Sequence, residues 1–71
     1  MPTASWNDIV RLAGPLFEQG LQPDRSDLLE LAFTGDYSDD VIDAIDSLDG
    51  KPIPSLDALR EKLAANGVLA D

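Results

Sequence analysis

The side chains of this 71-residue chain that could do chemistry are almost all carboxylates. Fourteen residues are Asp or Glu against five Lys or Arg, which gives a formal charge of −9, and His and Cys are absent. Without His or Cys, thiol nucleophiles, Ser-His pairs, haem ligation and the usual zinc sites are excluded. Paired carboxylates can do acid-base chemistry, but a domain this small has little room for the cleft that such chemistry needs. We therefore expect no enzyme activity and no cofactor.

The motif Asp46-Ser47-Leu48 is similar to the site at which acyl carrier proteins attach phosphopantetheine to a serine. Those proteins are also small, acidic and four-helical, and there the motif opens a long helix. In this chain Gly50 and two prolines follow closely, so a helix should end at the motif, because proline breaks a helix interior. Too few residues follow Ser47 for the two helices that such a carrier needs after its serine. A carrier function is therefore the least favoured alternative.

The stretch from Asp36 to Asp40 is similar to the start of a calcium loop, because oxygen ligands stand at alternate positions. However, the sixth position is Val41, where the loop needs Gly for a sharp turn, and the twelfth is Ser47, where it needs a bidentate Glu. We therefore predict no metal site, and we interpret Ser38 as a helix cap.

A row of six carboxylates follows the third expected helix and its ends. Steps of three and four residues place them on broadly one side of that helix, opposite its aliphatic residues. Like charges at this spacing destabilise a helix, and no base follows in the sequence until Lys51. The row is either a solvated surface or a docking face for a basic protein partner. Trp6 is either a lid over the core edge or an interface anchor. We call the following residues the acidic row: Asp36, Asp39, Asp40, Asp43, Asp46 and Asp49.

Helical periodicity and stop signals predict an all-α fold, a compact bundle of four short helices in a single domain over residues 1–71. The first helix should be bent or split at Gly14-Pro15, because proline removes a backbone donor and crowds the preceding turn. We expect the second helix to be the most buried, since apolar residues cover over half of its circumference. The expected helices are 6–19, 25–34, 39–48 and 56–65. Their expected N-caps are Ser5, Asp24 or Ser26, Ser38 and Ser55.

The connections also carry expectations. Gly20 and Leu21 are typical of a Schellman stop, Gly35 should end the second helix, and Ile53 should plug the core from a stiff connector. The expected core residues are Leu28, Leu31, Ala32, Ile42, Ile45, Leu59 and Leu63.

From Ser26 onward the chain resembles a family of small bacterial helical domains of unknown function. The family pattern is a capped helix with two apolar residues, a Gly turn, an acidic helix and a short loop before the last helix. The matching stretches are Ser26–Ala32, Asp39–Ile45 and Pro54–Asp57. The resemblance implies a fold and no activity, and it offers no catalytic residues to carry over.

Three functions therefore remain open. The first is a non-enzymatic protein-interaction module, an adaptor, regulator or antitoxin-like partner, that docks through the acidic row. The second is an inhibitor that imitates nucleic acid and occupies a DNA- or RNA-binding protein, and the third is the carrier. Direct nucleic-acid binding is disfavoured because it depends on Lys and Arg.

No apolar run approaches the ~20 residues of a membrane span, and a signal-peptide pattern is absent, so we expect a cytoplasmic chain that binds no membrane. The high charge favours a monomer, although apolar residues on the second helix could support a weak homodimer.

Overall fold

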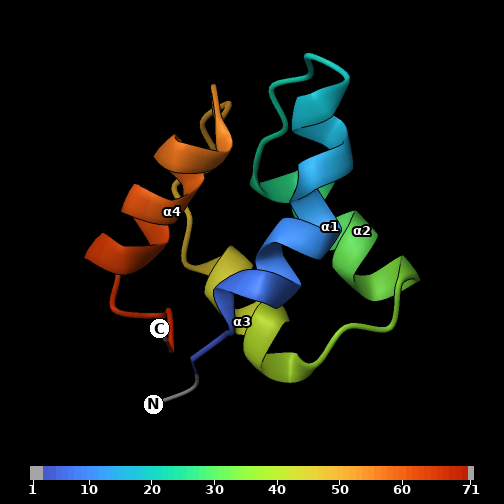
Figure 1. Ribbon diagram of the computed structural model, residues 1–71. Helices are drawn as coiled ribbons and strands as arrows, with labels where there is room; N and C mark the ends of the chain where they lie inside the picture. The colour runs from blue at the N-terminus through green and yellow to red at the C-terminus, as the bar shows by residue number, and fades with distance from the viewer. Residues whose placement is uncertain (1–2, 71) are drawn as a thin grey trace.

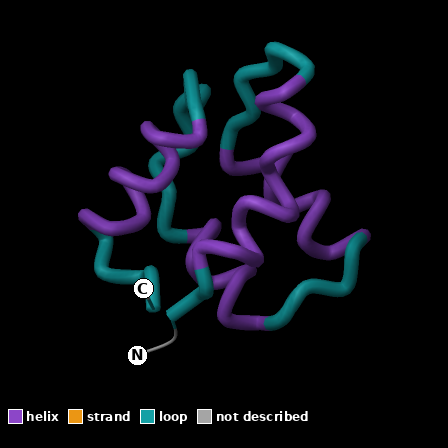
Figure 2. Tube along the Cα trace, in the orientation of Figure 1, coloured by secondary structure: helices purple, strands orange, loops and turns teal. Residues whose placement is uncertain are grey.

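The computed structural model describes residues 3–70, and over that range it contains four α-helices and no strand. The all-α prediction is therefore confirmed. Figure 1 shows the helices in a compact arrangement, and Figure 2 shows the loops that join them. The helices are α1 (Trp6–Glu18), α2 (Arg25–Thr34), α3 (Asp39–Asp46) and α4 (Leu56–Ala65).

The α1 helix runs without interruption through Pro15. The expected split at Gly14-Pro15 is therefore not found. Residues on both sides of the proline face the protein interior: Ile9, Leu12 and Ala13 are buried, and Leu16 packs against the core. Burial of this apolar face offsets the loss of one backbone hydrogen bond at the proline.

The end of α1 is a Schellman turn, as the sequence predicts. The N–H of Gly20 donates to the Phe17 carbonyl at 3.0 Å, and the N–H of Leu21 donates to the Leu16 carbonyl at 3.0 Å. Gly20 has a φ of 77°, the left-handed conformation that this turn requires. The turn directs the chain away from the helix axis and leaves the Leu21 side chain exposed.

Side chains cap three of the four helix N-termini. Asp24 accepts the N–H of Asp27 at 3.0 Å and the Asp27 carboxylate accepts the N–H of Asp24 at 3.3 Å, which is a reciprocal capping box. Ser38 and Ser55 each accept the backbone N–H three residues on, at 3.5 Å and 3.1 Å. Ser5 occupies the N-cap position of α1, but its side chain forms no cap hydrogen bond.

The α2 helix ends at Gly35 as expected, with Gly35 as its C-cap, but Gly35 does not take the left-handed conformation. Gly35 has a φ of −84°, and the next residue, Asp36, takes the left-handed conformation with a φ of 57°. The N–H of Asp36 donates to the Phe33 carbonyl at 3.3 Å, and the N–H of Tyr37 donates to the Ala32 carbonyl at 3.0 Å. This is again the Schellman pattern, but a residue with a Cβ occupies its left-handed position.

The core confirms most of the expected residues and corrects two. Leu28, Ala32, Ile45, Leu59 and Leu63 are buried as predicted. Ile53 is also buried, 1% exposed, and it plugs the core from the connector as expected. The full set of buried hydrophobic residues is Ala4, Ile9, Leu12, Ala13, Leu28, Ala32, Val41, Ala44, Ile45, Leu48, Ile53, Leu59 and Leu63.

The prediction that α2 is the most buried helix is wrong. Only Leu28 and Ala32 of this helix are buried, while Leu31 is 36% exposed and Phe33 is 65% exposed. The expected core residue Ile42 is only half-buried, on the edge of α3. The apolar residues of α2 are distributed around most of the helix, so its sequence shows no strong preference for burying one particular face. Packing against α1 and α3 decides which of these residues become buried.

Three backbone hydrogen bonds join two pairs of segments that are distant in the sequence. Near the chain ends, the N–H of Ala4 donates to the Val68 carbonyl and the N–H of Ala70 donates to the Ala4 carbonyl, both at 2.8 Å (Figure 1). In the middle of the chain, the N–H of Ile53 donates to the Pro23 carbonyl at 2.9 Å. The connector before α4 is therefore tied to the α1–α2 loop.

Candidate protein-interaction surface

The α3 helix places its carboxylates and its aliphatic residues on opposite sides, as the spacing predicts. Val41, Ala44, Ile45 and Leu48 are buried against the rest of the protein. All six members of the acidic row are exposed. The carboxylates therefore lie on a surface that a partner could reach.

Ion pairs divide the acidic row into two parts, which the sequence does not predict. The Asp46 carboxylate pairs with the guanidinium of Arg25, and the Asp49 carboxylate lies 3.8 Å from the ammonium of Lys62. These bases come from α2 and α4 and are remote from the row in sequence. The two ion pairs form only when α2 and α4 flank the end of α3. Of the two bases, Arg25, at the start of α2, is the one whose position in the sequence could have suggested such a pair.

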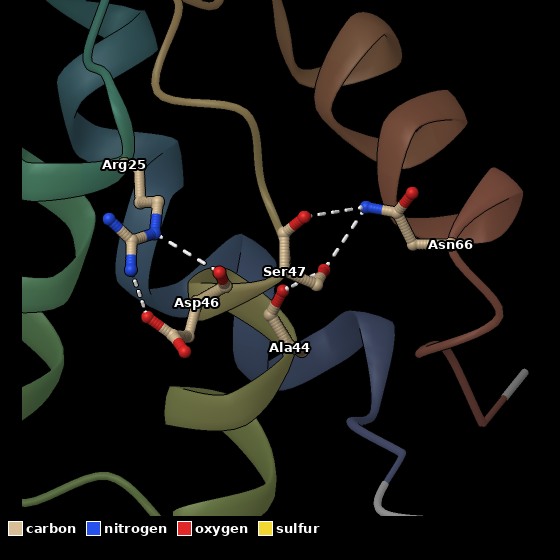
Figure 3. Close-up of polar contacts among 5 residues, drawn as sticks. All are labelled: Arg25, Ala44, Asp46, Ser47 and Asn66. Atoms are coloured by element: carbon tan, nitrogen blue, oxygen red, sulfur yellow. Dashed lines mark hydrogen bonds and ion pairs between the residues drawn. The ribbon is translucent and has the colours of Figure 1, made fainter.

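The paired end of the row belongs to a network that fixes the C-terminus of α3 (Figure 3). The Nε of Arg25 donates to the Asp46 carbonyl at 3.1 Å, in addition to the pair between their side chains. The Nδ2 of Asn66 donates to the Ser47 carbonyl at 3.2 Å and to the Ser47 Oγ at 3.1 Å. The last carbonyls of a helix have no partner within the helix, so Arg25 and Asn66 satisfy two of them from neighbouring elements.

Ser47 takes part in this network as a helix-ending residue. Its Oγ donates to the Ala44 carbonyl at 2.6 Å and accepts from Asn66. The helix ends at Asp46, with Ser47 as its C-cap, so the Asp-Ser-Leu motif closes a helix as the sequence predicts.

The other end of the row has no ion pair within residues 3–70. We call the residues there the unpaired acidic face: Asp36, Asp39, Asp40 and Asp43. Asp39 and Asp40 lie in the first turn of α3, where the partial positive charge of the helix N-terminus favours carboxylates. Asp43 lies beyond that turn and gains less from it. Three of these exposed carboxylates lie on α3 and one lies just before it, and none of the four forms an ion pair with a described base.

One base lies near this face. Arg11 and Asp36 line the same shallow hollow, together with the half-buried ring of Tyr37. Arg11 nevertheless forms no ion pair with a described residue. The hollow therefore brings a cation close to one edge of the unpaired acidic face without neutralising its carboxylates.

The surroundings of Asp49 lower the pKa of its carboxyl. The backbone N–H of Lys51 donates to its Oδ1 at 3.1 Å, and this bond is the main cause of a lowered pKa for that carboxyl. Desolvation opposes it, and the charges of Lys62 and Lys51 lower the pKa further. Over residues 3–70, no group of three or more acidic side chains is arranged to hold a metal ion.

Trp6 contributes to the protein interior and lies against α4. It opens α1, is half-buried and packs against the core. The guanidinium of Arg60 lies 5.5 Å from the centroid of its ring, within the range of a cation–π contact. One charged neighbour of Trp6 therefore comes from α4.

A second surface was not predicted from the sequence. A groove with a volume of about 520 Å³ lies between the end of α1 and one side of α2. Leu21 and Leu31, two of its lining residues, are 48% and 36% exposed. We call it the α1–α2 groove, and its lining residues are Leu16, Leu21, Gln22, Pro23, Asp27, Glu30, Leu31 and Thr34.

Within residues 3–70, no helix has the length and apolar character needed to cross a bilayer.

Comparisons of the chain with protein-family models, with curated proteins and with solved structures found no match. The resemblance to small bacterial helical domains therefore stays a prediction.

Proposed function

We propose that this protein is a non-enzymatic interaction module, an adaptor, regulator or antitoxin-like partner, that docks through the unpaired acidic face onto a basic surface of another protein. One observation carries the proposal. Of the six exposed carboxylates in the acidic row, the two at the C-terminal end are paired with Arg25 and Lys62, while the four at the other end have no described ion pair. The chain thus neutralises one end of the row and leaves the other available.

The cost of that arrangement supports a role for it. Carboxylates at i, i+3 and i+4 repel one another and destabilise a helix. Asp43 lies beyond the first turn, where the helix dipole offsets less of that repulsion. A basic partner would remove the repulsion on binding, and a charge of −9 would speed its approach.

The same observation gives the other functions less support. A protein that imitates nucleic acid needs a long run of available negative charge, and the ion pairs at Asp46 and Asp49 shorten that run. A carrier needs its serine hydroxyl at the start of a helix, whereas Ser47 lies at a helix end with its hydroxyl engaged.

The test is affinity capture with a pair of matched variants. Asp39→Asn combined with Asp43→Asn removes two charges from the unpaired acidic face. Asp57→Asn combined with Glu61→Gln removes two charges from exposed positions on α4 and serves as the control. Asp46 is left unchanged, because neutralising it would break its pair with Arg25. The main captured protein is then purified, and its affinity is measured for all three proteins.

We expect the α3 double variant to bind the purified partner more weakly and the α4 double variant to bind it as the wild type does, with both retaining wild-type helicity. Equal affinity of all three would contradict docking through this face. A captured partner whose own ligand is DNA or RNA, and which nucleic acid displaces from this protein, would favour the inhibitor that imitates nucleic acid.

A further inference from the structure

We propose that the α1–α2 groove is a second docking site, which binds an amphipathic helix whose apolar residues are flanked by Lys or Arg. This inference shares with the proposed function only the assumption of a protein ligand. It rests on different residues and on different helices from the unpaired acidic face.

The groove has an apolar floor with unused surface. Leu16 packs against the core, while Leu21 and Leu31 remain 48% and 36% exposed although both line the groove. Its volume is about 520 Å³. Apolar side chains of a partner would remove this leucine surface from water.

The charges around the groove select a cationic ligand. Asp27 and Glu30 line it, no Lys or Arg does, and neither carboxylate forms an ion pair within residues 3–70. An anionic peptide or an anionic lipid surface would be repelled. A second copy of the chain would bring another −9 charges to an acidic rim. Lys or Arg beside an apolar stripe would instead meet opposite charges at the rim.

The shape of the site favours a helix as the bound element. The described residues form no sheet whose edge an extended peptide could join. The groove is lined by the end of α1, the α1–α2 loop and one side of α2, and helix-in-groove recognition uses apolar anchors spaced by three or four residues. Leu21 and Leu31, on separate elements, would contact such a stripe together.

The site is also held in place before any ligand arrives. The Schellman turn at the end of α1 fixes the position of Leu21, with the N–H of Leu21 donating to Leu16 at 3.0 Å. Pro23 is buried, and its carbonyl accepts the N–H of Ile53 at 2.9 Å. A preformed groove loses less conformational entropy on binding.

The probe for the test is a synthetic amphipathic helical peptide made only of Leu and Lys. It is titrated into isotope-labelled protein and followed by NMR, next to a matched peptide of Leu and Glu. We expect saturable shift changes at the groove residues with the Leu/Lys peptide and no binding of the Leu/Glu peptide. Saturable shifts confined to the unpaired acidic face, or equal binding of both peptides, would overturn the proposal.

Variants on exposed positions give the second measurement. Leu21→Gln combined with Leu31→Gln keeps the charge and should weaken binding of the Leu/Lys peptide about tenfold, because two partly exposed leucines lose their apolar contact. Phe33→Gln is the control: Phe33 is on α2 and 65% exposed, but it does not line the groove. An equal loss in both proteins, or no loss in the double variant, would refute the assignment.

This test is independent of the proposed function. The Asp39→Asn/Asp43→Asn variant should bind the Leu/Lys peptide within about twofold of the wild type, since its groove is unchanged. If the groove does not bind the Leu/Lys peptide but partner capture depends on Asp39 and Asp43, only the proposed function is supported. If the groove binds the peptide and capture does not depend on those residues, only the groove proposal is supported.

Discussion

The turn that ends α2 makes a prediction opposite to the simplest interpretation of its sequence. A Gly-Asp pair after a helix suggests that the glycine adopts the left-handed conformation. In the structure Gly35 has a φ of −84° and Asp36 has a φ of 57°. Over residues 3–70, Asp36 is the one non-glycine residue with positive φ. Replacing Asp36 with glycine should therefore stabilise the protein.

The expected gain has two contributions. The left-handed conformation destabilises a residue with a Cβ by about 1–2 kcal/mol, and glycine avoids this cost. Glycine also has greater backbone freedom in the unfolded chain, which reduces the gain by about 0.5–1 kcal/mol. The Asp36 carboxylate lies just past the negative end of α2 and two residues before the Ser38 N-cap of α3, so the two helix ends act on its charge in opposite directions. Asp36→Asn should therefore stay within about 0.5 kcal/mol of the wild type. Asp36→Gly should gain about 0.5–1 kcal/mol from the backbone.

Gly35→Ala should have the opposite effect. A Cβ at this position would lie 2.8 Å from Cε2 of the Tyr37 ring and 3.1 Å from the Leu31 carbonyl oxygen. The Tyr37 ring packs against the core and so cannot move aside without losing contacts. Overpacking costs about 1–3 kcal/mol, more than the 0.4–1 kcal/mol that Gly→Ala gains by restricting the unfolded chain. We expect a net loss of about 1 kcal/mol.

The assay is urea and thermal unfolding followed by circular dichroism at fixed pH and salt. The expected order of stability, from highest to lowest, is Asp36→Gly, then Asp36→Asn and the wild type close together, then Gly35→Ala. Each 1 kcal/mol should shift the midpoint of thermal unfolding by about 4–8 °C in a domain of this size. If Gly35→Ala stabilised the protein and Asp36→Gly destabilised it, the assignment of the left-handed position to Asp36 would be refuted.

The features that follow from short stretches of sequence were predictable. The bounds of α2 and α4 match the expected 25–34 and 56–65, because caps and stop signals act within one helical turn. Ser38 and Ser55 cap their helices through the N–H three residues on. The opposition of carboxylates and aliphatic residues on α3 follows from the helical period alone.

The features that depend on several helices were not predictable. The exposure of Leu31 follows from which side of α2 packs against its neighbours, and a helix whose apolar residues are spread around most of its circumference does not encode that choice. The pairing of Asp46 with Arg25 joins residues 21 positions apart, so the acidic row looked continuous when it is divided. The α1–α2 groove likewise needs Leu21 and Leu31 from separate elements.

Two further predictions test the core and the acidic row. Ile45→Ala should lower the free energy of unfolding by about 2–5 kcal/mol through the cavity that it leaves. Leu31→Ala should lower it by less than about 1 kcal/mol, because Leu31 is 36% exposed. Equal losses for the two variants in urea unfolding would contradict this assignment of the core. For Asp49, NMR titration should give a carboxyl pKa below its ordinary value of 3.8. Because the folded pKa is lowered, the stabilisation from this carboxylate is complete above the ordinary value and is lost as pH falls through the folded one. The backbone N–H of Lys51 is the main cause, so Lys62→Ala should leave the pKa of Asp49 lowered, and its return to the ordinary value would show that the ion pair dominates instead.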